Sequence, residues 1–222
     1  FKMIRIAIDG PSGSGKSTLA KAVARELGII YVDTGALYRT VGYYVFTRGI
    51  DPRDELAVKA ILPEMHIKLQ YGEGGQRVIL NGEDLGDKIR LPEMSMYASF
   101  VSSLPSVRAF LLEMQKSLAR ENSVVMDGRD IGTVIIPDAD LKIFLTASNE
   151  TRAHRRTLEL KAKGIDVKYE DVLADMIERD NNDKNRDVAP AIAAEDAIIF
   201  DNSTKSVEDS VCEIVRLLNE RK

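Results

Sequence analysis

The segment that most constrains the fold is a glycine-rich loop near the start of the chain, Gly-Pro-Ser-Gly-Ser-Gly-Lys-Ser at residues 10–17. It directly follows an apolar run at residues 3–8, which predicts a buried strand, and it directly precedes a helical pattern that ends at Gly28. The loop matches G-x-x-x-x-G-K-[ST], in which glycines let backbone N–H groups surround an anion at a helix N-terminus. The order strand, loop, helix therefore predicts a site for the phosphates of a nucleotide.

The residues of this loop have separate expected tasks. Lys16 would place a positive charge on the β- and γ-phosphates, and the Ser17 hydroxyl would bind Mg²⁺. The predicted cofactors are therefore ATP and Mg²⁺. The residues expected to bind the nucleotide here are Gly10, Ser12, Gly13, Ser14, Gly15, Lys16, Ser17 and Thr18.

Asp127 is the candidate for a second metal-binding residue. It ends the apolar run at residues 124–126, which is the position of the acidic residue that organises the metal in many phosphate-loop proteins. The alternative is a solvated carboxylate at the end of a strand, and we favour the metal role.

The fold class follows from five short apolar runs that alternate with helical stretches. Runs of this kind suit strands covered on both faces, and their alternation with helices predicts a parallel α/β sheet. The runs lie at residues 3–8, 29–32, 124–126, 141–145 and 197–200.

The long stretch between the second and third runs predicts an inserted subdomain, because about ninety residues are too many for one crossover. Residues 67–71 and 78–80 alternate between apolar and polar side chains, and the Gly-Glu-Gly-Gly sequence at residues 72–75 predicts a turn between them. A small antiparallel sheet is therefore expected inside the insert. In the last helix we expect Ser206 as N-cap and Val207 and Cys212 in the core.

The charge balance narrows the possible partners. The chain of 222 residues has a formal net charge of -4, which argues against a nucleic-acid or membrane-surface protein. No window approaches the roughly 18 apolar residues of a membrane span. The single cysteine fits a reducing cytosol, so we expect a cytoplasmic protein and, by default, a monomer.

Three classes of phosphate-loop protein compete at this point. A GTP-binding switch should carry Asn-Lys-x-Asp, which the sequence lacks, and a motor or helicase ATPase would be larger with further motifs. A small-molecule kinase needs arginines that neutralise the transferring phosphoryl group. Such arginines gather in the second half of the chain: Arg129, Arg152, Arg155, Arg156, Arg179 and Arg186.

Some of these arginines belong to a charged helical stretch at residues 152–188. Arg152 and Arg156 would share one helix face, with Arg155 as the alternative to Arg156. By itself this stretch is typical of an exposed helix with many ion pairs. Next to a phosphate loop it favours a lid that brings positive charge to the phosphates and excludes water.

Four motifs together resemble the bacterial cytidylate kinases. They are the loop at 10–17, Asp-Thr-Gly-Ala-Leu-Tyr-Arg at 33–39, Asp-Gly-Arg-Asp-Ile-Gly-Thr at 127–133, and Glu-Arg-Asp with a following Asn-Arg at 178–186. The resemblance covers essentially the whole chain. It implies a five-stranded parallel core in the order 2-3-1-4-5 with helices on both faces, an insert that binds a nucleoside monophosphate, a helical lid, and transfer from ATP-Mg to CMP or dCMP.

The same resemblance implies the limits of these parts and the residues of the acceptor site. A single domain over residues 1–222 would comprise a core at 3–34, 98–151 and 189–222, an insert at 35–97 and a lid at 152–188. The implied residues are Arg39, Arg129 and Arg186 around the CMP phosphate, Ser99, Arg108 and Asp130 at the cytosine, Arg179 and Asp183 at the ribose, Thr34 near the nucleotide, and Arg152 and Arg156 near ATP.

The expected mechanism is direct in-line transfer, with Lys16, Arg129, Arg156 and Arg186 as catalytic residues. A carboxylate can accept a hydrogen bond from the cytosine N4 amine, whereas uracil presents an acceptor at that position. Two alternatives stay open: a kinase for another small acceptor such as UMP, another nucleoside monophosphate or shikimate, and a non-catalytic nucleotide-binding module.

Overall fold

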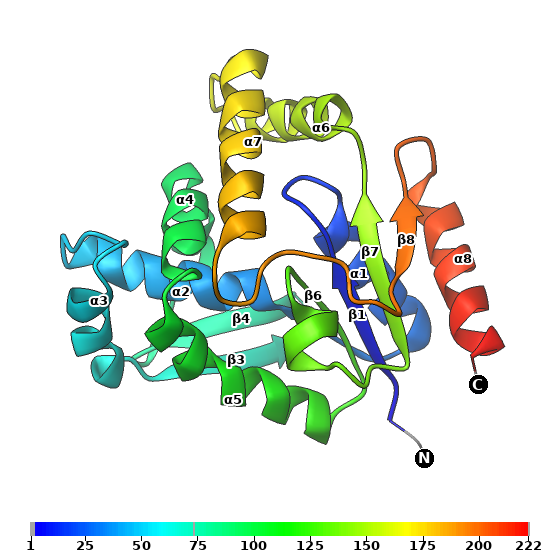
Figure 1. Cartoon of the computed structure of the whole chain (residues 1–222), viewed down its shortest axis with the longest axis horizontal. Coiled ribbons are helices and arrows are strands. Elements are labelled where there is room, and N and C mark those ends of the chain that lie inside the picture. Colours follow the sequence, from blue (N-terminus) through cyan, green and yellow to red (C-terminus); the bar gives the residue numbers. More distant parts are fainter. Residues whose placement is uncertain (1–2, 73, 222) are drawn as a thin grey trace.

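A parallel sheet of five strands forms the centre of the computed structural model, which describes residues 3–72 and 74–221 (Figure 1). The strand order is β2-β6-β1-β7-β8, and every neighbouring pair is parallel. Counted along the chain within this sheet, the order is 2-3-1-4-5, so the predicted fold class is confirmed. The strands are β1 (Arg5–Asp9), β2 (Ile30–Asp33), β6 (Val124–Gly128), β7 (Leu141–Thr146) and β8 (Ile198–Asp201).

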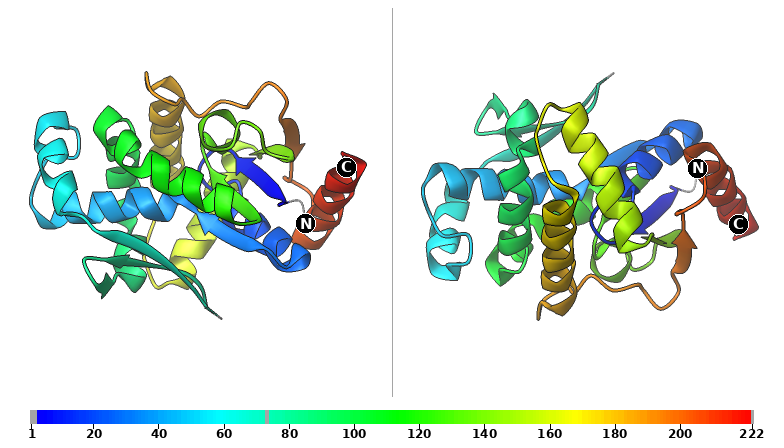
Figure 2. Two further views of the ribbon diagram at one scale, coloured as in Figure 1. Left: turned by 90° about the horizontal axis from the view of Figure 1, so that it is seen from below. Right: turned by 90° about the horizontal axis from the view of Figure 1, so that it is seen from above.

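Helices cover both faces of this sheet because alternate residues of a strand point to opposite faces. In β1, Ile6 and Ile8 pack with α1 and α8, whereas Ala7 packs with α5 and η3 on the other face. Two further views of the ribbon show these layers (Figure 2). The covering helices are α1 (Lys16–Leu27), α5 (Pro105–Glu121), η3 (Ile131–Ile135) and α8 (Val207–Glu220).

The last helix confirms one expectation and corrects two. The Ser206 hydroxyl accepts a hydrogen bond from the Asp209 amide, so the predicted N-cap is confirmed. Val207 and Cys212 were expected in the core, but both are exposed. Val207 is the first residue after the cap, and Cys212 lies beside the buried stripe that includes Ile214.

The insert between β2 and β6 contains the expected small antiparallel sheet, with strand order β3-β4-β5. Glu73, in the predicted turn, lies outside the described residues. The Gln76 side chain joins this sheet to the core, because it accepts from the Asp33 amide at 2.9 Å and donates to the Asp33 carbonyl at 3.1 Å. The elements of the insert are α2 (Thr34–Thr47), α3 (Glu55–Ile61), η1 (Leu62–Glu64), β3 (Ile67–Gly72), β4 (Gly75–Leu80), β5 (Glu83–Asp84), η2 (Gly86–Arg90) and α4 (Pro92–Val101).

Two charged helices, α6 (Asn149–Ala162) and α7 (Tyr169–Asn185), lie beyond the carboxyl ends of β7 and β8 (Figure 1). They pack on each other through a small apolar cluster that includes Leu160 and Met176. The expected limits of the insert and the lid, at residues 97 and 152, fall inside α4 and α6. Among the described residues, no helix combines the length and apolar character needed to cross a membrane.

Candidate active site

The phosphate loop connects β1 to α1 at the carboxyl edge of the sheet. At Gly10 the backbone has φ 152°, and an added Cβ would lie 2.1 Å from the Leu145 carbonyl oxygen. At Gly13 the backbone has φ 68°, and an added Cβ would lie 2.8 Å from the Met176 side chain of α7. Glycine is therefore required at both positions, by close packing as well as by backbone conformation.

Lys16, at the end of this loop, has a backbone carbonyl as its hydrogen-bond partner. Its side chain is buried, and its ammonium donates to the Pro11 carbonyl at 2.7 Å. Burial and the neighbouring Arg129 lower the pKa of Lys16 well below its usual range. An anion at the loop would relieve this effect, because its negative charge would favour the buried ammonium.

Ser17 and Asp127, the predicted metal-binding residues, lie together although they are 110 residues apart in the chain. The Ser17 hydroxyl donates to one carboxylate oxygen at 2.9 Å, and the Tyr31 hydroxyl donates to the other at 2.8 Å. Burial and the neighbouring Asp33 raise the pKa of Asp127 to about 6. Tyr31 was missed by sequence reasoning because a tyrosine in an apolar strand carries no sign of its partner.

A small cavity lies between the insert, the end of β6 and α7, with a volume of about 50 Å³. Most of the predicted acceptor residues line it, and they come from segments far apart in the sequence. Arg39, also predicted at the acceptor, is not among the described residues that line the cavity; it lies on α2 and forms an ion pair with Asp33 at 2.8 Å. The predicted residues that line it are Thr34, Ser99, Arg108, Arg129, Asp130, Arg179, Asp183 and Arg186.

Asp130 is surrounded by cations at one end of the cavity. It is ion-paired with Arg108, and its other oxygen lies 3.8 Å from the Arg186 guanidinium. Burial raises the pKa of Asp130, and burial together with Arg108 lowers the pKa of Arg186. The Ser102 carbonyl accepts a hydrogen bond from Arg108, and the Ser102 hydroxyl accepts one from Arg186. Sequence reasoning missed Ser102 because these partners meet only in the folded chain.

Asp183 is the second carboxylate of the cavity. It accepts from Arg129 at 2.9 Å and from the Ser99 hydroxyl at 3.0 Å. Arg179, predicted with Asp183 to contact a ribose, lines the same cavity and donates to the Ser12 hydroxyl of the phosphate loop at 3.2 Å. Burial and then the nearby Arg129 lower the pKa of Arg179 to about 10.

The predicted lid arginines have three different settings. Arg152 is buried and donates to the Ser12 carbonyl at 2.6 Å. Arg155 donates to Asn202, which in turn donates to the Ser14 carbonyl of the phosphate loop at 2.9 Å. Arg156 is paired with Glu159 at 2.8 Å on its own helix. Two of the three arginines therefore contact the loop or its immediate support.

Asp180 is a further contact to the loop that sequence reasoning missed. Its carboxylate accepts from the Ser12 amide at 3.0 Å and is ion-paired with Arg152. It thus occupies a backbone N–H group of the kind that phosphate loops offer to phosphate. Asp180 belongs to the alternating-charge segment, in which no feature distinguishes it from its exposed neighbours.

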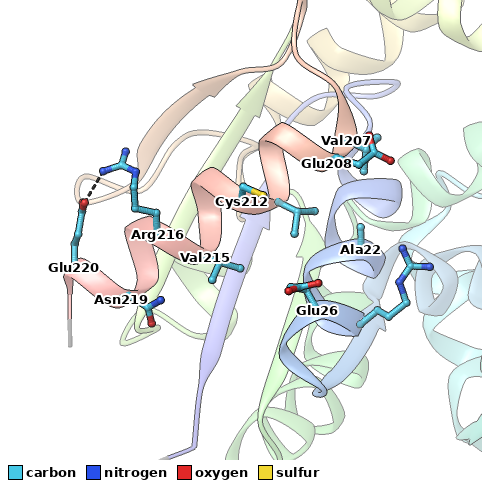
Figure 3. A pocket seen from close by; sticks show the side chains of 11 residues that line it. Ala22, Glu26, Val207, Glu208, Cys212, Val215, Arg216, Asn219 and Glu220 are labelled. Carbon is cyan, nitrogen blue, oxygen red and sulfur yellow. Dashed lines mark hydrogen bonds and ion pairs between the residues drawn. The ribbon is translucent and has the colours of Figure 1, made fainter.

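A larger groove of about 680 Å³ lies between α1 and α8, and Figure 3 shows the side chains that line it. Val215 and Cys212 contribute apolar surface, and Arg216 is paired with Glu220 along its rim. None of the predicted site residues lines this groove, so the candidate active site is the phosphate loop together with the smaller cavity.

The chain is similar to known cytidylate kinases over almost its whole length. A family model described as cytidylate kinase matches residues 6–220. The cytidylate kinase of Caldicellulosiruptor bescii is 50% identical over 98% of this chain and 96% of its own length. That of Fervidobacterium nodosum is 49% identical over 98% of this chain and 97% of its own length. A solved structure of an uncharacterized protein from Eubacterium ventriosum shares the fold at 16% identity, with a TM-score of 0.50 over 98% of this chain and 99% of its own.

Proposed function

The chain belongs to the cytidylate kinase family, and we propose that it transfers the γ-phosphoryl group of ATP to CMP or dCMP, giving ADP and CDP or dCDP. The two parts of the candidate site would then hold the two substrates. The phosphate loop would bind ATP, and the cavity beside it would bind the acceptor.

A cluster of cations between the two parts is the observation that carries this proposal. Arg129 and Arg179 lie close enough to Lys16 to contribute to its lowered pKa. Arg129 and Arg39 contribute in the same way to the lowered pKa of Arg179. Within the described part of the chain, the buried Nε of Arg179 and Nη2 of Arg186 have no hydrogen-bond partner. Carboxylates such as Asp183 already offset part of this positive charge, and the phosphates of two nucleotides would offset the rest.

The acceptor base would be recognised at the Asp130 end of the cavity. A carboxylate there accepts from the N4 amine of cytosine, and Arg108 and Ser99 would donate to ring acceptors. Uracil would place its O4 acceptor against the same carboxylate, leaving a buried hydrogen bond unmade. This arrangement supports CMP over UMP as acceptor.

Acceptor binding also requires the cavity to open. Its volume of about 50 Å³ is well below the roughly 300 Å³ or more of typical small-molecule sites. The contacts that close it join α7 to the other wall, through Asp183 with Arg129 and Arg186 with Asp130. The phosphate and base of CMP would replace these internal partners, so movement of α7 is the expected opening step.

The donor set at Ser17 and Asp127 fits Mg²⁺. Both groups offer oxygen, which this ion prefers, and Mg²⁺ is commonly held by one or two protein groups plus substrate phosphates. When bound, Mg²⁺ would neutralise part of the charge on the ATP phosphates.

The residues of this chain would act mainly by positioning and charge neutralisation. The acceptor is already an anion, so in-line transfer needs no strong general base. Lys16, Arg129 and Arg186 would surround the transferring group, and Arg156 would join them after leaving Glu159. The monomeric state and the cytoplasmic location stay predictions.

An acceptor panel tests the proposed function. ADP release from ATP-Mg is measured by a coupled assay with CMP, dCMP, UMP, AMP, GMP and shikimate, each against a no-acceptor control. We expect the highest kcat/KM with CMP or dCMP. Turnover with AMP or shikimate but not CMP would contradict the proposal, and no turnover with any acceptor would favour a nucleotide-binding module.

A further inference from the structure

Asp9 is a buried carboxylate that the proposed mechanism does not use. It is the last residue of β1 and directly precedes Gly10, the first residue of the phosphate loop. One of its oxygens accepts from the Ile131 amide at 2.8 Å, and the other accepts from the Gly132 amide at 2.8 Å. Both amides follow directly after Arg129 and Asp130, two of the proposed acceptor-binding residues.

The anchor for these two hydrogen bonds is the central strand of the sheet. β1 is paired on both sides, and Asp9 lies in register with Gly128 of β6 and Phe144 of β7. The regular pairing of β1 and β6 ends at this point, where the chain turns through Arg129 and Asp130. The Asp9 side chain therefore continues the connection to the sheet beyond the end of the ladder.

Gly132 is closely packed against its neighbours. A Cβ added there would lie 3.1 Å from Cδ of Lys142 and 3.4 Å from Oδ2 of Asp9. The backbone after Asp130 is thus held between the Asp9 carboxylate and the Lys142 stem. A side chain with one acceptor and one donor could not replace Asp9, because its donor would face an N–H group.

We propose that Asp9 is a positioning residue that sets Arg129 and Asp130 relative to the phosphate loop, and thereby aligns the acceptor with ATP. This inference rests on the proposed function, because it assigns Arg129 and Asp130 to the acceptor. The physical basis is that a small misplacement of groups that hold a substrate lowers the rate steeply.

The test compares Asp9→Asn with the wild type in the coupled assay, with CMP, UMP and ATP each varied in turn. Asparagine keeps the shape of the side chain and loses one of the two hydrogen bonds. We expect KM for CMP to rise and the CMP/UMP ratio of kcat/KM to fall, each by about tenfold, with a much smaller change in KM for ATP. An equal rise of both KM values, or no change in either, would overturn the inference.

Asp54→Asn is the matched control. Asp54 also accepts from a backbone amide at the start of a helix, that of Ala57 at 3.0 Å, but it is exposed and is not among the described residues that line the small cavity or the larger groove. We expect this variant to keep both KM values and the CMP/UMP ratio.

Two further measurements separate the possible failures. Asp130→Ala tests base recognition itself: if it leaves the CMP/UMP ratio unchanged, the proposed function fails at that point, whereas a loss with Asp130→Ala but not with Asp9→Asn overturns only the inference about Asp9. If Asp9→Asn does not fold, hydrogen exchange of the wild type decides. The Ile131 and Gly132 amides should exchange as slowly as those of β1, and rapid exchange would overturn the inference.

Discussion

The phosphate loop and the acceptor cavity bind similar chemical groups in the proposed reaction, yet they are built in different ways. The loop is one continuous segment between β1 and α1, and its conformation depends on glycines within that segment. The cavity takes its side chains from α2, α4, α5, the end of β6 and the region of α7. A site made by one segment can be recognised as a motif, whereas a site made by several segments exists only in the folded chain.

The two regions also differ in how their charges are balanced. The Lys16 ammonium has a carbonyl oxygen as its hydrogen-bond partner, and we expect it to bind an anion. In the cavity Arg129 and Arg108 are each paired with a buried carboxylate. Apart from the Ser12 amide, which Asp180 covers, the loop should therefore accept phosphates with little rearrangement, while the cavity must exchange internal ion pairs for contacts with its ligand. Three variants test this difference.

The largest effect is expected for Lys16→Ala. Loss of the point charge on the phosphates should lower kcat by about 10²- to 10³-fold, because that charge stabilises the transferring group. Lys59, exposed on α3, serves as the control site, and Lys59→Ala should leave kcat unchanged. Steady-state ADP release measures both. Near-normal turnover of Lys16→Ala would remove the loop from the proposed mechanism.

A smaller and more selective effect is expected for Asp130→Ala. The kcat/KM for CMP should fall by about 10- to 100-fold, while that for UMP should fall less, because only cytosine loses a hydrogen bond to the carboxylate. The melting temperature must be followed in parallel, since the change leaves Arg108 buried without its ion-pair partner. Asp87→Ala, which removes an exposed carboxylate of the insert, is the control. It should change neither the CMP/UMP ratio of kcat/KM nor the melting temperature.

The smallest effect is expected for Asp180→Ala, and its sign is opposite. The Asp180 carboxylate occupies the Ser12 amide and neutralises Arg152, so its removal should free both groups for phosphate. We expect ATP to bind about three- to tenfold more tightly in isothermal titration calorimetry. Asp171→Ala changes an exposed carboxylate on the same helix and should not alter ATP affinity. Weaker ATP binding by Asp180→Ala would show that this contact supports the loop rather than competing with its ligand.

Much of the core could be predicted from local patterns. Apolar runs at strand length, such as that of β6, indicate burial on both faces, and this is how the sheet is covered. The errors lie where local pattern and packing diverge. Cys212 is apolar enough for a core, but it lies off the stripe of α8 that contacts α1, so it is exposed.

The sequence by itself determined the phosphate-loop motif, because the conformation of residues 10–17 follows from glycines and a helix start that lie within the segment. Through motif resemblance it also predicted which residues form the acceptor site, and that assignment stays a prediction. The tertiary structure alone decided how those residues are paired. Asp183 accepts from Arg129, Asp180 covers the Ser12 amide, and Asp9 reaches past the end of its strand to the backbone beside Asp130. These pairings join residues more than fifty positions apart, and their strength depends on burial, which only the packed chain provides.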